Sequence, residues 1–181
     1  MLTGLIKERF FKHHGELLAY MDAIEEVVQE IFDSPDPADR FQHHRARLDQ
    51  LFQFLHRWEA QHEQEEERIL LPLLQRQLEA GDDPASIESL KRVGREHVQG
   101  QEMVRDLSQR LGELESGRLS EPAEFYKFSV ELNALVWHFR RHVWSENELI
   151  LPTAEKLIPD SADRLWTHRN DTVPAEEPAD E

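Results

Sequence analysis

The sequence contains no cysteine, and this absence removes several kinds of chemistry at once. Disulfide bonds, thiolate catalysis and cysteine-ligated iron–sulfur clusters are all excluded. The sequence also lacks any apolar run that approaches the ~20 residues a membrane-spanning helix needs. Its N-terminal stretch has neither the apolar core nor the small-residue cleavage site of a signal peptide. We therefore expect a cytoplasmic protein.

Positive charge is scarce as well. The chain has 21 Lys and Arg against 37 Asp and Glu, which gives a formal net charge of −16. Nucleic acid and anionic membranes would repel such a surface, so we expect neither as a partner. The sequence indicates no particular protein partner.

Glycine is rare, with seven in 181 residues, while 39% of the residues are apolar and 32% are charged. This composition favours a helical protein with a packed core. The length suggests one domain with a tail. We place the domain at residues 1–159 and a disordered acidic tail at residues 160–181, where the composition shifts.

The apolar residues recur at steps of three and four, which is typical of amphipathic helices. This pattern predicts helices over about residues 5–32, 38–71 and 85–114, and a fourth from about 122, followed by a short turn to about 158. Proline and glycine clusters separate them. Two αα-hairpins of this kind would bring four helices around one core, so we expect an all-α fold.

One stretch occurs twice, 80 positions apart. In the first copy, Glu66 follows His62 by four residues and Pro72 follows after three apolar residues. The second copy repeats this pattern, and its residues are His142, Glu146 and Pro152. Residues four apart on a helix stack about 6 Å from each other, so each His and Glu can reach one metal ion together, or a pair of ions that the carboxylate bridges. Each proline is expected to stop or kink its helix.

A further inward-facing histidine precedes each copy, His14 by 48 residues and His97 by 45. His13 is nearly as well placed as His14, and the spacing leaves both open. The four helices would bring four imidazoles and two carboxylates together. This donor set suits iron, manganese or zinc, and two carboxylates can bridge two ions ~3.5–4 Å apart.

A carboxylate-rich di-iron site is the competing arrangement in helical bundles. Only Glu59 and His62 fit its Glu-x-x-His motif, and Phe139 stands where the fourth helix should supply a glutamate. The histidine-rich site is therefore favoured. Other charged and histidine residues are expected to be structural or solvated. These are Glu63, Glu65 and Glu67 on a solvated face, and His43, His44 and His56 as structural histidines.

At these residues the sequence resembles the hemerythrin-like family, in its HHE cation-binding branch, over about residues 5–158. The resemblance implies an up-down-up-down four-helix bundle with a non-haem di-iron centre that binds O₂ or related small ligands. It also implies that two carboxylates bridge the ions and that four histidines are terminal ligands. The bridging residues would be Glu66 and Glu146, and the terminal ligands would be His14, His62, His97 and His142.

The sequence departs from this family at the fifth histidine. Oxygen-carrying members have two histidines four apart on the third helix, whereas Val93 and Gln101 flank His97 here. We take His138 as the candidate for the missing ligand, with Glu59 or Glu63 behind it. The departure argues against reversible oxygen carriage.

We therefore expect a centre of two iron ions that meets O₂, NO or peroxide, in sensing, stress response or iron handling. Manganese and zinc are possible substitutes for iron. Two alternatives stay open. One is a metal-free acidic helical bundle that acts as an interaction module, and the other is a peroxidase- or oxidase-like enzyme at the same site.

Overall fold

The computed structural model describes residues 4–58, 62, 63 and 65–158, and this part of the chain is helical without any strand. The all-α prediction is confirmed. The described residues contain six α-helices and two short π-helical segments. They are α1 (Gly4–Phe32), α2 (Pro37–Trp58), η2 (Glu66–Leu70), α3 (Leu71–Ala80), α4 (Pro84–Glu115), α5 (Pro122–Ser145), η3 (Glu146–Ile150) and α6 (Leu151–Leu157).

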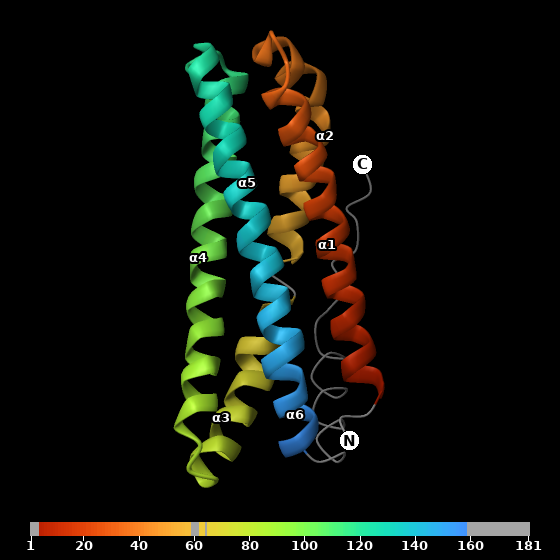
Figure 1. Ribbon diagram of the computed structural model, residues 1–181, viewed down its shortest axis with the longest axis vertical. Coiled ribbons are helices and arrows are strands. Elements are labelled where there is room, and N and C mark those ends of the chain that lie inside the picture. The colour runs from red at the N-terminus through yellow and green to blue at the C-terminus, as the bar shows by residue number, and fades with distance from the viewer. Residues whose placement is uncertain (1–3, 59–61, 64, 159–181) are drawn as a thin grey trace, which may run out of the picture.

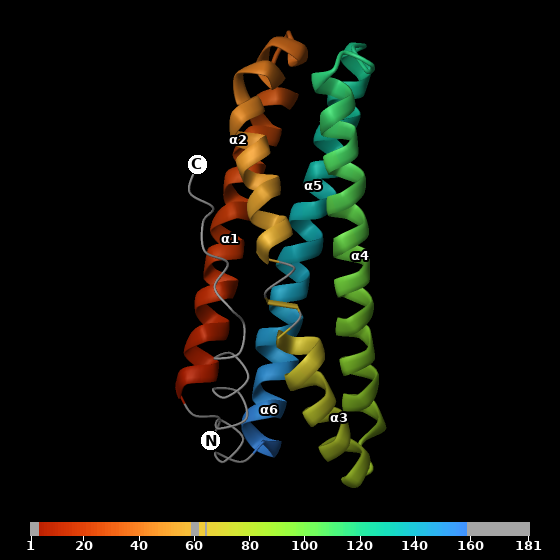
Figure 2. The same cartoon turned by 180° about the vertical axis from the view of Figure 1, so that it is seen from behind.

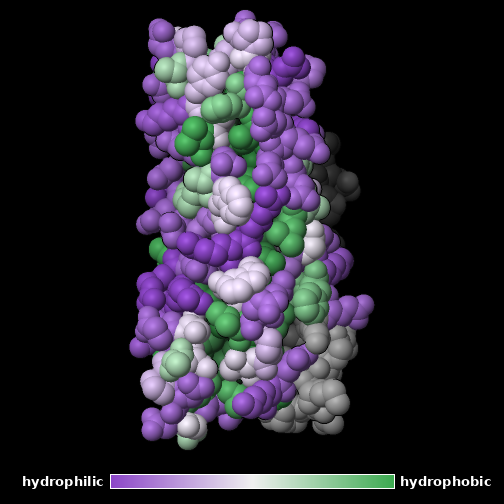
Figure 3. Space-filling model, viewed as in Figure 1, coloured by the Kyte–Doolittle hydropathy of each residue, from purple (hydrophilic) through white to green (hydrophobic). Residues whose placement is uncertain are grey.

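The long helices α1, α2, α4 and α5 lie side by side along the long axis of the molecule (Figures 1 and 2). Helix α1 packs against α2 and α5, and α4 packs against α5. Helix α3 contacts both α4 and α6 and fills the end of the molecule where both termini of the described chain lie. The face seen in Figure 3 is mostly hydrophilic, and its hydrophobic groups follow the seams between helices. In the described residues, no helix is both long and apolar enough to cross a bilayer.

Local capping chemistry sets several helix ends close to the predicted ones. Before α2, the Asp36 side chain accepts a hydrogen bond of 3.0 Å from the backbone N–H of Asp39. Before α4, Asp83 accepts one of 3.1 Å from the backbone N–H of Ser86. Each cap satisfies an amide of the first turn that has no partner within its helix.

The second predicted helix differs from the observed one. A continuous helix over 38–71 was expected, but α2 ends at Trp58 and π-helical segment η2 begins at Glu66. Pro72 does not stop the helix, because it lies in the first turn of α3, which runs on to Ala80. The first turn of a helix tolerates proline since its amides need no intrahelical acceptor.

The second half of the chain also has a π-helical segment followed by a proline. The backbone N–H of Leu71 bonds to the carbonyl of Glu66, and that of Leu151 bonds to the carbonyl of Glu146. Both bonds span five residues, which is the π-helical register. Each π segment therefore begins at the glutamate of a duplicated motif, and a proline follows where the α-helical register resumes.

The apolar core consists of two clusters. The larger one is built mainly from α1, α2, α4 and α5, and its fully buried members include Leu17, Met21, Phe41, Leu48, Phe128 and Leu135. The smaller one lies around α3 and α6, and it consists of Phe10, Leu70, Leu74, Leu78, Leu90, Val93, Ile150, Leu151, Ala154 and Ile158. Burying each large apolar side chain stabilises the fold by about 1.5–3 kcal/mol. The predicted acidic tail lies outside the described residues.

Candidate metal centre

Six buried side chains form two overlapping groups of possible metal ligands between the two apolar clusters. In each group, one ligand atom from every member lies within 4.8 Å of the others. The first group is His14, His62, Glu66 and Glu146, and the second is Glu66, His97, His142 and Glu146. All six side chains are about 1% exposed. They are the six residues that the duplicated motif and the inward histidines suggested.

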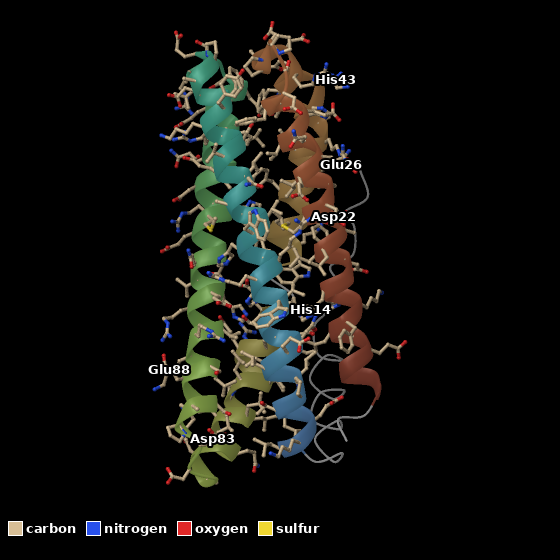
Figure 4. All side chains as sticks on the ribbon, viewed as in Figure 1. His14, Asp22, Glu26, His43, Asp83 and Glu88 are labelled. Atoms are coloured by element: carbon tan, nitrogen blue, oxygen red, sulfur yellow. The ribbon has the colours of Figure 1, made fainter. Side chains whose placement is uncertain are left out.

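The first group is centred on the Nε2 atoms of two histidines. His14, labelled on α1 in Figure 4, places its Nε2 3.1 Å from Nε2 of His62. The same His14 atom lies 3.0 Å from Oε2 of Glu146, and Nε2 of His62 lies 3.3 Å from Oε1 of Glu66. Both imidazoles therefore turn the same nitrogen toward the two carboxylates.

The second group repeats this arrangement with the other two histidines. Nε2 of His97 lies 3.1 Å from Oε2 of Glu66 and 3.4 Å from Oε1 of Glu146. Nε2 of His142 lies 3.1 Å from that same Glu146 oxygen. Each carboxylate thus turns one oxygen toward each pair of histidines, which is the disposition a bridging ligand requires.

The Nδ1 atoms of the four histidines point away from the carboxylates to outer partners. Nδ1 of His14 lies 2.9 Å from Oδ1 of Asn147, and Nδ1 of His62 lies 3.3 Å from Nδ1 of His13. An acceptor at Nδ1 fixes the proton there and leaves the Nε2 lone pair free for a metal ion.

The second pair of histidines has outer partners of a different kind. Nδ1 of His97 lies 3.3 Å from Oε1 of Glu67, and Nδ1 of His142 lies 3.4 Å from Oε2 of Glu96. The sequence analysis did not identify the outer partners as such. They adjoin the ligands in sequence, and that adjacency was the available signal.

The metal-free histidines have strongly shifted proton affinities. Burial lowers the pKa of His62 to about 2. Burial also opposes the charged form of His97, but hydrogen bonds and charge from Glu146 and Glu66 outweigh it and raise that pKa to about 11. For His142, burial is likewise outweighed by the charge and hydrogen bond of Glu146, and the pKa rises to about 10.

The two carboxylates shift in opposite directions. Burial, with the nearby charge of Glu146, raises the pKa of Glu66 well above its usual value. Burial acts the same way on Glu146, but His142, His14 and His97 outweigh it and hold that pKa well below its usual value. Without metal, the site therefore keeps protons on His97 and His142, and a cation must displace them.

Several polar atoms of this site are buried and have contacts of 3.0–3.3 Å within the site, but among the described residues none of these contacts has hydrogen-bond geometry. They include both carboxylate oxygens of Glu66, Oε2 of Glu146 and Nε2 of His142. Leaving such atoms unpaired costs free energy that a bound cation would remove. Imidazole nitrogens and carboxylate oxygens together are donors that iron, manganese and zinc accept. The residues present therefore fit a metal centre.

Glu63 is also buried at this level of the molecule, so its assignment to a solvated face was wrong. Its Oε2 accepts a hydrogen bond of 2.6 Å from Gln101, while Oε1 has no partner among the described residues. Burial raises the pKa of Glu63, and the nearby His97 and His142 act against that rise. Glu59, the other reserve candidate, lies outside the described residues.

His138 is buried but is not a member of either group of described residues. Its Nε2 donates a hydrogen bond of 3.0 Å to the backbone carbonyl of Glu96. Phe139 takes the core-facing direction on α5, and this turns His138 toward α4. A Cβ on Gly100 would lie 3.2 Å from Nε2 of His138, so that glycine permits the close approach of the two helices.

Two other described histidines lie away from the centre. His44 pairs with Glu30 at 2.9 Å, and His56 bonds to Ser108 at 3.1 Å. His13, the sequence alternative to His14, is the outer partner of His62 and is not a member of either group.

A comparison with family models matches the chain to the Hemerythrin HHE cation binding domain over residues 5–154. All six residues of the two groups lie in the matched range. No curated protein and no solved structure gives a significant match.

Proposed function

The chain belongs to the hemerythrin HHE cation-binding family, and on this basis we propose that it holds a non-haem di-iron centre that binds O₂, NO or peroxide. The fold proposed around the centre is an up-down-up-down four-helix bundle in a domain of residues 1–159. The alternating course of the long helices in Figures 1 and 2 supports it. The cytoplasmic location and the role in sensing, stress response or iron handling stay predictions.

The sharing of Glu66 and Glu146 between the two ligand groups is the observation that carries the proposal. A mononuclear site needs no carboxylate that faces two pairs of histidines. Two ions ~3.5–4 Å apart need such bridges. In this proposal His14 and His62 hold one ion, His97 and His142 hold the other, and manganese or zinc can replace iron.

Glu63 is the seventh ligand in our proposal, in place of His138. Its free Oε1 is buried, and His97 and His142 are the histidines that act most on its charge, which assigns it to their side of the centre. Gln101, by donating to Oε2, holds the carboxylate in place. His138 has its Nε2 committed to the Glu96 carbonyl.

Apolar and aromatic groups shield the centre. The Phe10 ring packs edge-on against His14 and His62 at centroid distances of 5.8 and 5.2 Å, and Trp58 lies 4.5 Å from the His62 ring. Such walls exclude water and favour small ligands with little charge. When bound, the two metal ions would supply one-electron redox chemistry and an open coordination position. The chain supplies the ligands, their orientation and the dry surroundings.

Iron content and an optical spectrum test the proposal. Protein grown with iron should contain close to two irons per chain, and an oxidised, bridged pair should absorb in the near ultraviolet. A metal-free interaction module would show neither. Less than one metal per chain, even after anaerobic reconstitution with ferrous iron, would overturn the proposal.

The seventh ligand has its own test. Glu63→Gln keeps the partner of Gln101 but removes the charge, so it should change the spectrum and the azide affinity of the loaded protein. His138→Gln, a change at the same level of the molecule, should leave both properties unchanged. The reverse result would make His138 the ligand.

A further inference from the structure

The four outer partners of the histidines occupy equivalent places in the two halves of the chain. His13 directly precedes His14 and contacts His62, and Glu96 directly precedes His97 and contacts His142. The other two partners form an equivalent pair in the same way. Asn147 directly follows Glu146 and contacts His14, and Glu67 directly follows Glu66 and contacts His97. The pseudo-twofold pattern therefore extends beyond the ligands.

The chemistry of these equivalent partners differs between the halves. The first pair of ligand histidines contacts a carboxamide oxygen and an imidazole. That imidazole belongs to His13. The second pair contacts two carboxylates. The partner distances, 2.9 and 3.3 Å against 3.3 and 3.4 Å, show no closer contact on the acidic side. Charge is therefore what distinguishes the outer partners of the two pairs, and it acts at the same position as the carboxylate of Glu63 proposed above.

A carboxylate behind a ligand imidazole makes the imidazole a stronger donor to its metal ion. Glu96 has the larger effect of the two, because its side chain is 7% exposed while that of Glu67 is 46% exposed and screened by water. Arg141 lies near Glu96, with its Nε 3.7 Å from Oε1, and it opposes part of this effect from the surface.

We propose that these outer contacts make the two metal positions electronically unequal, so that a singly oxidised centre holds its ferric ion at the His97–His142 position. This inference rests on the di-iron function proposed above. A one-electron oxidant such as ferricyanide removes one electron from the doubly ferrous centre. The position with the stronger donors, backed by Glu96 and Glu67, loses that electron.

Mössbauer spectra of the singly oxidised, ⁵⁷Fe-loaded protein test the inference. The wild type should show one ferric and one ferrous component of equal area. Glu96→Gln keeps an acceptor oxygen and removes the charge, so it should alter the ferric component alone. It should also raise the lower of the two midpoint potentials, by about 59 mV if the ferric–ferrous ratio changes tenfold.

Asn147→Asp is the matched control, because it adds a carboxylate behind His14 at the place equivalent to that of Glu67. This variant should alter the ferrous component and bring the two midpoint potentials closer. Glu67→Gln should act as Glu96→Gln does, but less strongly. If Glu96→Gln fails to hold iron, Glu67→Gln shows which position holds the ferric ion. A delocalised valence, or an effect of the glutamate variants on the ferrous component, would overturn the inference. Failure of the wild type to load two irons would instead refute the proposed function.

Discussion

At the scale of single residues, Glu66 and Glu146 occupy the same place in a repeated motif, but their pKa values shift in opposite directions in the metal-free protein. Glu146 faces three histidines that hold its pKa well below its usual value, whereas burial and Glu146 itself keep the pKa of Glu66 high. Two acids at this separation in a buried site do not both ionise without a cation. The two glutamates therefore have equivalent positions in the proposed metal centre but different proton affinities in the metal-free protein.

Substitution of each glutamate by glutamine should separate its part in metal binding from its effect on the stability of the metal-free protein. Glu66→Gln and Glu146→Gln should each lose most of the bound iron, because a neutral amide is a poor bridge between two cations. In the metal-free protein, burial and Glu146 already disfavour the charged form of Glu66, so Glu66→Gln should change the unfolding free energy little. Glu146→Gln removes the partner of His97 and His142 and should cost about 3 kcal/mol. Iron analysis measures the loss of metal, and chemical denaturation measures the loss of stability. Equal stability losses in the two variants would contradict the opposite pKa shifts of Glu66 and Glu146.

The sequence predicted the six residues of the two groups because helical spacing places each on a buried stripe. It did not predict their outer partners, since a residue directly before or after a ligand normally faces another direction. Glu63 illustrates the same limit. It directly follows His62 and lies among acidic residues, yet it is buried. Neighbour relations across helices depend on rotation and axial shift, which periodicity does not give.

At the scale of secondary structure elements, each π segment begins at one of the two glutamates that the ligand groups share. A π segment adds one residue to a helical turn, so it changes the face that the following residues present. Neither segment was predicted, because a His and a Glu four residues apart satisfy the α-helical pattern equally well. The prolines were the visible signal, and they mark where the α-helical register resumes.

Replacing Pro152 should test this role. Pro152→Ala supplies a backbone N–H that can bond in the α register, so the helix should lose the π turn of η3. Iron affinity should then fall on the order of tenfold, as for lost support of a ligand, while metal-free stability holds or rises. Pro122→Ala is the control, because Pro122 starts α5 and no helical turn precedes it directly. Calorimetric titration with ferrous iron measures the affinity. Unchanged affinity in Pro152→Ala would show that the proline does not maintain the π turn.

At the scale of the whole molecule, the ligands form a polar layer between two apolar clusters. Along α1, Phe10 belongs to the smaller cluster, His14 to the ligand layer and Leu17 to the larger cluster. The same order appears on α4, where His97 lies between Val93 and Val104. The smaller cluster has fewer buried side chains, so its packing depends more on the polar layer that joins it to the larger cluster.

Metal removal should therefore affect the two ends of the molecule unequally. Hydrogen exchange in α3 and α6 should become faster by at least tenfold when iron is chelated. The ends of α1 and α2 far from the centre should change little, because the larger cluster packs them directly. Exchange measured by mass spectrometry with and without iron shows the pattern. A uniform change along the chain would contradict it.

The metal-free protein should lose stability as pH rises above about 6.5. Below that value, the unfolded chain protonates His62 while the folded chain, with a pKa of about 2, does not, but the raised pKa of Glu66 acts in the opposite direction, so these two shifts offset each other. Above it, folded His97 and His142 keep protons that the unfolded chain releases, so stability falls as pH rises toward about 10. Each uncompensated proton contributes a slope of about 1.4 kcal/mol per pH unit. Urea denaturation between about pH 5 and pH 9 measures this curve, and a monotonic rise would contradict it.

The division of ligands between the halves has a consequence for assembly. Residues before the turn at Gly81–Asp83 supply His14, His62 and Glu66, and residues after it supply His97, His142 and Glu146. Each hairpin thus brings both histidines of one position and one of the two bridges. If that turn opened, two copies could exchange hairpins, and each hairpin would meet the same complementary surface in the other chain. The resulting dimer would contain two complete centres, each made from two chains, without a single new contact.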